Sequence, residues 1–255
     1  IDTQSECLRD PDYLFNDSEI YKISAACGLY INNKISAQLV PLEKEQSACL
    51  VEASYSIFEH QANIIKRLKS FIEGGGKRTL IHMPTGSGKT RTSMRYIGEV
   101  INNGAKILWI TYQSELIIQA REEFKKMWKS LGSRTACINS ITGTHEGEVN
   151  EYLNADIIFA SFTKLALMEE KLLYQMTKHI THIFIDEAHE SLTPTRTKVI
   201  NSLMKKRDRL LIGLTATPGR TTEASREDDT QLSEMFDSNK ITIQCDGYSS
   251  PMNFL

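Results

Sequence analysis

Residues 83–90, MPTGSGKT, have the pattern of a phosphate-binding loop, and this pattern constrains the fold more than any other feature of the chain. A strand-like run, 79–82, precedes the loop, and apolar residues recur at helical spacing after it, at Met94, Ile97, Val100 and Ile101. A phosphate loop requires this order because the start of the helix supplies part of the phosphate site. The segment therefore predicts a strand–loop–helix unit that binds the phosphates of a nucleotide.

The residues within the loop suit phosphate chemistry. Two glycines, Gly86 and Gly88, allow the backbone to curl so that successive N–H groups point at phosphate oxygens. Lys89 can reach the β and γ phosphates, and the Thr90 hydroxyl can ligate Mg²⁺. A chance loop of similar composition is the alternative when the segment is taken alone. We expect ATP and Mg²⁺ as cofactors, with contacts from Pro84, Thr85, Gly86, Ser87, Gly88, Lys89 and Thr90.

An acidic motif supplies the second half of a hydrolytic site. Asp186, Glu187, Ala188 and His189 follow the apolar, strand-like run 180–185. Asp186 would lie at the carboxyl edge of a sheet, where it can hold Mg²⁺ through water, and Glu187 can orient and deprotonate the attacking water. The alternative is an acidic pair that caps a helix. Together with the phosphate loop, the motif predicts ATP hydrolysis with Lys89, Asp186 and Glu187 as catalytic residues.

Further segments follow in order: 57–61 (IFEHQ), 107–111 (ILWIT) with Leu116 and Gln119, 156–165 (DIIFASFTKL) and 214–220 (LTATPGR). Combined with the two motifs above, this set resembles the first RecA-like motor domain of superfamily-two helicases and translocases. The likeness is to the DEAH-box kind, which is related to restriction-enzyme motor subunits, and it spans residues 55–255. Met83 replaces the first glycine of the phosphate-loop pattern, and the Pro84-Thr85 that follows it is typical of the helicase type.

The resemblance implies a base-binding motif at residues 57–61. In this family the amide of Gln61 would pair with adenine through a donor and an acceptor, and Phe58 would pack on the ring face. Many relatives carry arginine at the position of Phe58. The alternative is that Phe58 lies in the core and that Gln61 is a solvated helix residue.

The resemblance also implies residues that connect hydrolysis to nucleic acid. His189 would act in catalysis and link the γ-phosphate site to Thr215 and Thr217. Backbone N–H and hydroxyl donors at strand ends suit nucleic-acid phosphates without reading sequence, and the residues concerned are Thr111, Ser114, Ser161, Thr163 and Lys164. The alternative for these serines and threonines is helix capping. A short basic cluster, 205–207 with Arg209, is either part of such a surface or a solvated run.

Composition frames these expectations. The 255 residues are 40% hydrophobic and 24% charged, enough to bury one large core, and the net charge of −2 excludes the strongly basic signature of many nucleic-acid binders. It does not exclude a motor that grips the backbone along one face. The five cysteines are odd in number and show no close pairing, which favours free thiols, and no second histidine stands at zinc-ligand spacing. The chain has no long apolar run and no leader pattern, so we expect a cytoplasmic protein.

Strand-like and helical patterns alternate through the chain, which predicts an α/β fold: a RecA-like P-loop domain with a mainly parallel sheet covered by helices on both faces, plus a small N-terminal appendage. Expected strands are 79–82, 106–111, 136–139, 156–160, 180–185, 210–214 and 241–244. Expected helices are 58–73, 89–103, 114–131, 163–176 and 194–204, and the polar stretch 221–230 is expected to be a loop. We divide the chain into residues 1–50 of unknown role, the ATP-binding domain 51–246, and residues 247–255, the start of a linker to a second motor domain.

The function expected from these features is a nucleic-acid-dependent ATPase motor of a DNA helicase or translocase, in restriction or defence against foreign DNA. The alternatives are an RNA helicase motor, since backbone contacts do not separate the sugars, and a nucleotide-dependent protein-interaction switch. Expected partners are nucleic acid, with DNA favoured over RNA, the second motor domain and partner subunits, without a membrane. In the family the second motor domain carries an arginine that stabilises the transferred phosphoryl group, so hydrolysis by this chain alone is expected to be weak.

Overall fold

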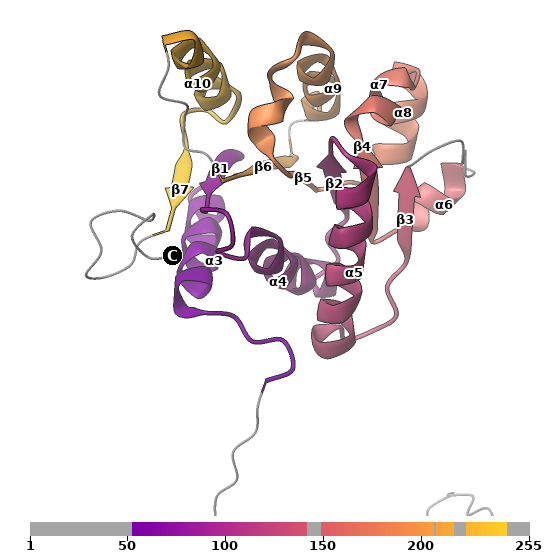
Figure 1. Ribbon diagram of the computed structural model, residues 1–255. Helices are drawn as coiled ribbons and strands as arrows, with labels where there is room; N and C mark the ends of the chain where they lie inside the picture. The colour runs from indigo at the N-terminus through magenta and orange to yellow at the C-terminus, as the bar shows by residue number, and fades with distance from the viewer. Residues whose placement is uncertain (1–52, 142–148, 207, 217–222, 244–255) are drawn as a thin grey trace, which may run out of the picture. The chain divides into compact units, whose positions relative to one another are not determined.

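The computed structural model describes residues 53–141, 149–206, 208–216 and 223–243, with the backbone alone for residues 223–228 (Figure 1). In these residues a sheet has the strand order β3-β4-β2-β5-β6-β1-β7, and every neighbouring pair is parallel. The expected α/β fold with a parallel sheet is confirmed. The strands are β1 Arg78–His82, β2 Ile107–Thr111, β3 Ile138–Ile141, β4 Ile157–Ser161, β5 His182–Ile185, β6 Leu210–Thr215 and β7 Lys240–Thr242.

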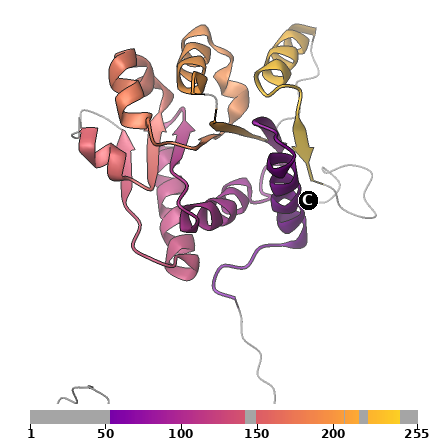
Figure 2. The same ribbon diagram turned by 180° about the vertical axis from the view of Figure 1, so that it is seen from behind.

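Helices connect the strands and cover the sheet on both faces (Figures 1 and 2). They are α3 Glu59–Glu73, α4 Lys89–Asn102, α5 Ser114–Leu131, α6 Val149–Asn154, α7 Phe162–Leu167, α8 Glu170–Thr177, the 3₁₀ helix η1 Ala188–Leu192, α9 Pro194–Met204 and α10 Glu223–Met235. Alternate residues of β2 show the layering. Ile107 and Trp109 belong to a core with α3, α4 and α5, whereas Leu108 and Ile110 belong to the core under α6 to α10.

The strand order brings the motifs to one edge of the sheet. Strands β5, β6 and β1 are neighbours, so the acidic motif after β5, Thr215 at the end of β6 and the phosphate loop after β1 lie side by side at the same edge. Strands β2 and β4 form the adjacent part of the sheet, with Thr111 opposite Ser161. The sheet therefore places the predicted nucleotide residues on one group of strands and the predicted nucleic-acid residues on the next.

A buried acidic residue organises the opposite edge. The carboxylate of Asp156 accepts two hydrogen bonds from Arg134 at 2.8 and 2.9 Å, one from Lys106 Nζ at 3.1 Å and one from Cys137 N at 2.9 Å. Burial alone would raise the pKa of Asp156, but these hydrogen bonds outweigh burial and hold the pKa at about 2, below its ordinary value of 3.8. The network therefore stabilises the fold above pH 4, and this stabilisation is lost as the pH falls toward 2.

Several sequence-based boundaries were wrong: β5 begins at His182 and not at residue 180, and packing explains three other differences. The expected helix 163–176 is divided, because Met168 and Glu169 are extended and let α7 pack on β4 while α8 packs on α6 and α9. The expected loop 221–230 is helical from residue 223 on, since α10 is held by the buried Leu232 and by Phe236 just beyond its end. Strand β3 begins two residues later than expected, where the Cys137 backbone instead binds Asp156. Residues 1–50, 247–255 and Thr217 lie outside the described residues.

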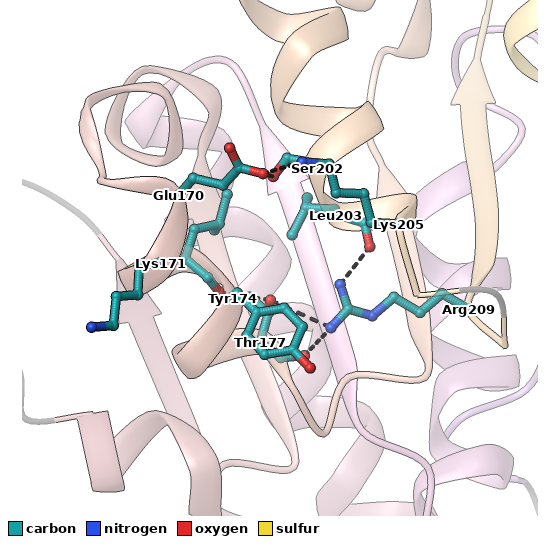
Figure 3. A pocket seen from close by; sticks show the side chains of 9 residues that line it. Glu170, Lys171, Tyr174, Thr177, Ser202, Leu203, Lys205 and Arg209 are labelled. Carbon is teal, nitrogen blue, oxygen red and sulfur yellow. Dashed lines mark hydrogen bonds and ion pairs between the residues drawn. The ribbon is translucent and has the colours of Figure 1, made fainter.

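Arg209, which the sequence placed in a basic surface cluster, is a buried residue. Its guanidinium donates hydrogen bonds to the carbonyl oxygens of Thr177, Ile180 and Leu203, near the ends of α8 and α9, and its side chain is 2% exposed. Arg209 lines a pocket of about 390 Å³ between these helices, and Figure 3 shows the side chains around it. Arg209 thus satisfies the carbonyl groups that a helix leaves unpaired at its C-terminus. The surface interpretation was wrong for this residue.

Candidate active site

The phosphate loop has the backbone conformation that its glycines permit. Gly86 and Gly88 have φ angles of +82° and +83°, in the left-handed region that side-chain-bearing residues rarely adopt. Ser87 folds back on the loop, with its hydroxyl donating to Pro84 O at 2.6 Å. Lys89 begins α4 directly after Gly88, so the helix N-terminus and the lysine face the same loop. This arrangement offers backbone N–H groups and one cation to a phosphate chain.

The segment expected to bind the base, residues 57–61, is attached to the loop through the Ser87 carbonyl. Gln61 Nε2 donates to Ser87 O at 3.0 Å, and His60 Nε2 lies 3.2 Å from the same oxygen. Gln61 Oε1 accepts a hydrogen bond from Phe58 N at 2.9 Å. The packing is close, because a Cβ atom on Gly88 would lie 2.2 Å from Gln61 Nε2. Gln61 therefore connects the start of α3 to the phosphate loop, and these contacts leave one N–H and one oxygen lone pair of its amide unused.

The solvent exposure of Phe58 and Gln61 is the reverse of the alternative in which Phe58 lies in the core and Gln61 is solvated. Gln61 is 2% exposed and is not a solvated helix residue, whereas Phe58 is 72% exposed and is not a core residue. The Phe58 ring stacks on the His60 ring with centroids 5.7 Å apart and an interplanar angle of 11°. One face of an aromatic pair thus stands beside the motif that contacts the loop, a surface on which a base can stack.

The acidic motif faces the phosphate loop. Glu187 Oε1 lies 3.8 Å from Lys89 Nζ, and Asp186 is buried at the end of β5. Glu187 has a φ angle of +49°, an uncommon backbone conformation for a residue with a side chain and one that is enriched at functional sites. Glu187 precedes η1 but makes no side-chain capping bond, so the helix-capping alternative does not describe it. The residue that the sequence suggested as general base therefore lies next to Lys89, the lysine expected to bind phosphate.

His189 connects the acidic motif to β6. Its Nδ1 lies 3.2 Å from Thr215 Oγ1 and 3.6 Å from Glu187 Oε2, and its Nε2 lies 3.6 Å from Glu190 Oε1. The structure thus brings together His189 and Thr215, the first half of the expected coupling contact. Thr217, the second half, lies outside the described residues.

The residues expected to contact nucleic acid divide into two groups. Thr111 is fully buried and its hydroxyl donates to Gln113 O at 2.8 Å, and the buried Ser161 hydroxyl caps α7 by accepting from Lys164 N at 3.3 Å. These two hydroxyl groups therefore form hydrogen bonds with the backbone, and for Ser161 this is the helix capping that the alternative proposed. Ser114 and Thr163 are exposed and the Lys164 side chain is half-buried, so these three remain accessible to a ligand.

The donor groups at the site suit Mg²⁺. A hard cation of this size takes oxygen ligands and keeps several waters. The Thr90 hydroxyl, in α4, and the carboxylate of Asp186, the residue after β5, would supply oxygen. When bound, Mg²⁺ neutralises charge on the β and γ phosphates. Among the described residues no group of three His, Cys, Asp or Glu side chains is placed to hold a metal by itself, so phosphate and water would complete this shell.

Magnesium affinity should depend on pH through Asp186. Burial, and then the neighbouring Glu187, raise the pKa of Asp186 from 3.8 to about 6, and a protonated carboxyl cannot bind the metal. We expect the Mg²⁺ affinity of the ATP complex to fall about tenfold per pH unit below pH 6 and to level off above pH 7. Titration of Mg²⁺ at fixed ATP between pH 5 and 8 measures this. The Asp186→Asn variant retains only the protonation of ATP, so an identical pH profile in both proteins would contradict the assignment.

Comparison with known proteins establishes the family. A family model described as "Type III restriction enzyme, res subunit" (ResIII) matches residues 54–220, more than half of the chain. The chain therefore belongs to the ResIII family. A comparison with curated proteins found no match.

Solved helicase structures share the fold. The helicase domain of Pyrococcus furiosus Hef is 20% identical with a TM-score of 0.57, over 75% of this chain and 39% of that one. A hypothetical ATP-dependent RNA helicase from Sulfolobus tokodaii is 22% identical with a TM-score of 0.55, over 74% and 53%. The DUF1998 helicase MrfA bound to DNA is 16% identical with a TM-score of 0.55, over 75% and 28%. The chain thus spans about half or less of each of these proteins, and the likeness defines its fold as that of a helicase RecA-like domain.

The sequence missed two residues at this site. His60 contacts Ser87 O, and His82, at the end of β1, lies 3.2 Å from Ala216 O through its Nε2. Each histidine adjoins a recognised motif, which was the available signal, but its partner lies 27 or 134 residues away.

None of the described helices is long and apolar enough to cross a membrane.

Proposed function

We propose that this chain is the ATP-hydrolysing motor domain of a DNA helicase or translocase that acts in restriction or defence against foreign DNA. One observation carries the catalytic part of the proposal. Lys89 and Glu187 come from different strand ends, 98 residues apart, and meet at 3.8 Å beside the buried Asp186. A base beside a phosphate-binding lysine and a magnesium-binding carboxylate is the set of groups that ATP hydrolysis requires.

In this proposal the remaining site residues bind and position ATP. The loop 83–90 wraps the phosphates, Thr90 and Asp186 hold Mg²⁺, and the base stacks on Phe58 with one amide contact from Gln61. Glu187 takes a proton from the attacking water. His189, through its contact with Thr215, links this chemistry to the nucleic-acid side of the domain.

Several observations favour nucleic acid, and DNA over RNA, as the track. The accessible residues Ser114, Thr163 and Lys164 lie at the starts of α5 and α7, beyond the ends of the adjacent strands β2 and β4, where hydroxyl and ammonium groups can contact backbone phosphates. The family is named for a restriction enzyme subunit, and one similar structure is a DNA complex. Another is titled as an RNA helicase, so RNA is the competing substrate.

Nucleic-acid-stimulated ATP hydrolysis tests the proposal. The full-length protein is assayed with duplex DNA, single-stranded DNA, single-stranded RNA or no addition, with Lys89→Ala as the blank. We expect duplex DNA to raise the rate of the wild type and Lys89→Ala to remain at background, because the variant lacks the cation on the β and γ phosphates. Stimulation by RNA alone would select an RNA helicase. ATP binding without stimulation by any nucleic acid would select a protein-interaction switch.

A further inference from the structure

His82 is a buried polar residue that the proposed chemistry does not use. It is the last residue of β1, directly before the phosphate loop, and its side chain is 6% exposed. Its Nε2 lies 3.2 Å from Ala216 O, and because a carbonyl oxygen only accepts, Nε2 carries the proton and donates. Its Nδ1 is buried and has no hydrogen-bond partner among the described residues.

The ring is a neutral donor. Burial, and then the nearby Lys240, lower the pKa of His82, so the imidazole is uncharged at neutral pH, with Nδ1 left as an acceptor. A buried acceptor without a partner costs free energy that an apolar residue of similar size would avoid. Packing alone therefore does not account for a histidine at the end of a buried strand. Its hydrogen bond to Ala216 is the feature that an aliphatic side chain could not supply.

That hydrogen bond continues a connection between the phosphate loop and β6. Met83 N donates to Thr215 O at 3.0 Å, and His82 donates to the next carbonyl, Ala216 O. Strand β6 ends at Thr215, so Ala216 lies beyond the sheet ladder and the His82 contact reaches past it. His189 contacts the Thr215 hydroxyl from the acidic motif. The end of β6 is thus held from both halves of the ATP site.

We propose that His82 is a positioning residue that transmits the stimulation of ATP hydrolysis by nucleic acid, through its hydrogen bond to the Ala216 carbonyl. The inference rests on the proposed function, a nucleic-acid-dependent ATPase. His82 holds the end of β6 in a fixed position relative to the phosphate loop. A conformational change in the loop therefore moves the end of β6, and a change at the end of β6 moves the loop. In this role His82 acts through Ala216 and needs no contact with ATP or the attacking water.

Three substitutions separate the hydrogen bond from packing. His82→Leu fills the space and removes the donor. His82→Gln places an amide N–H near the position of Nε2, whereas His82→Asn is shorter and cannot reach Ala216. Thr79→Val is the matched control, because Thr79 is equally buried in β1 but lies at the other end of the strand. ATP affinity, melting temperature and ATP hydrolysis with and without nucleic acid are measured for each full-length variant.

We expect His82→Leu and His82→Asn to bind ATP with an affinity within about twofold of the wild type and to lose about tenfold in stimulation, the effect of one hydrogen bond. His82→Gln should recover most of the stimulation, and Thr79→Val should keep it. The comparison of Gln with Asn decides the question even if the leucine variant does not fold. Full stimulation of ATP hydrolysis in His82→Leu or His82→Asn, or an equal loss of stimulation in the Gln and Asn variants, would overturn the inference about His82 but leave the proposed function intact. A wild-type rate that no nucleic acid changes would overturn the proposed function as well.

Discussion

Replacement of Glu187 by glutamine should lower ATP turnover by about 10³-fold while leaving ATP binding intact. The carboxylate is the group that we propose deprotonates water, and it lies 3.8 Å from Lys89 on a backbone with a φ angle of +49°. Glutamine has the same length and can adopt the same conformation, so the variant removes the base and little else. Loss of the negative charge also frees Lys89 for the phosphates, so ATP affinity should be unchanged or higher. Single-turnover hydrolysis and equilibrium ATP binding measure the two effects.

Glu190→Gln is the matched control for this experiment. Glu190 is three residues further along, on η1, and its carboxylate also approaches His189, at 3.6 Å, but it pairs with Arg196 instead of Lys89. We expect the rate of ATP hydrolysis by this variant to stay within about threefold of the wild type, since a partly exposed ion pair such as Glu190–Arg196 contributes little free energy. A turnover of Glu187→Gln close to that of Glu190→Gln would remove Glu187 from the role of base.

The second large effect concerns stability. Substitution of Arg209 by leucine should destabilise the domain by about 4 kcal/mol, because the carbonyl groups of Ile180 and Leu203 lose the Arg209 donor and that of Thr177 keeps only its bond from Ile180 N. These groups lie near the ends of α8 and α9, and Arg209 itself is buried. Leucine fills part of the space but donates nothing. Urea unfolding followed by circular dichroism gives the free energy of unfolding of each variant.

Lys205→Leu tests the same basic cluster at the surface. Lys205 forms an ion pair with Glu170 in which both side chains are mostly exposed. We expect a change below about 1 kcal/mol, the usual worth of a surface ion pair. Equal destabilisation by the two substitutions would show that the cluster acts as a whole and that the Arg209 hydrogen bonds have no special importance.

Local patterns account for most of the fold and for the central residues of the site. The alternation of strands and helices predicts parallel pairing, and a phosphate loop and an acidic motif that each follow a strand must then meet at one edge of the sheet. Gly86 and Gly88 were expected to need an unusual backbone, and both have positive φ angles. These features follow from sequence because each depends on residues a few positions apart.

The tertiary structure decided what depends on distant partners. The sequence could not place Arg209 in the interior, because its three acceptors come from other segments. Nor could helical periodicity show that the expected helix 163–176 divides in two, since the break allows α8 to pack on α6 and α9. The contact of His82 with Ala216 likewise requires β1 to lie beside β6. The sequence by itself indicated which groups are proposed to carry the chemistry. Only the packing of strands distant in the chain decided how those groups are held, since hydrogen-bond geometry across a sheet depends on strand order.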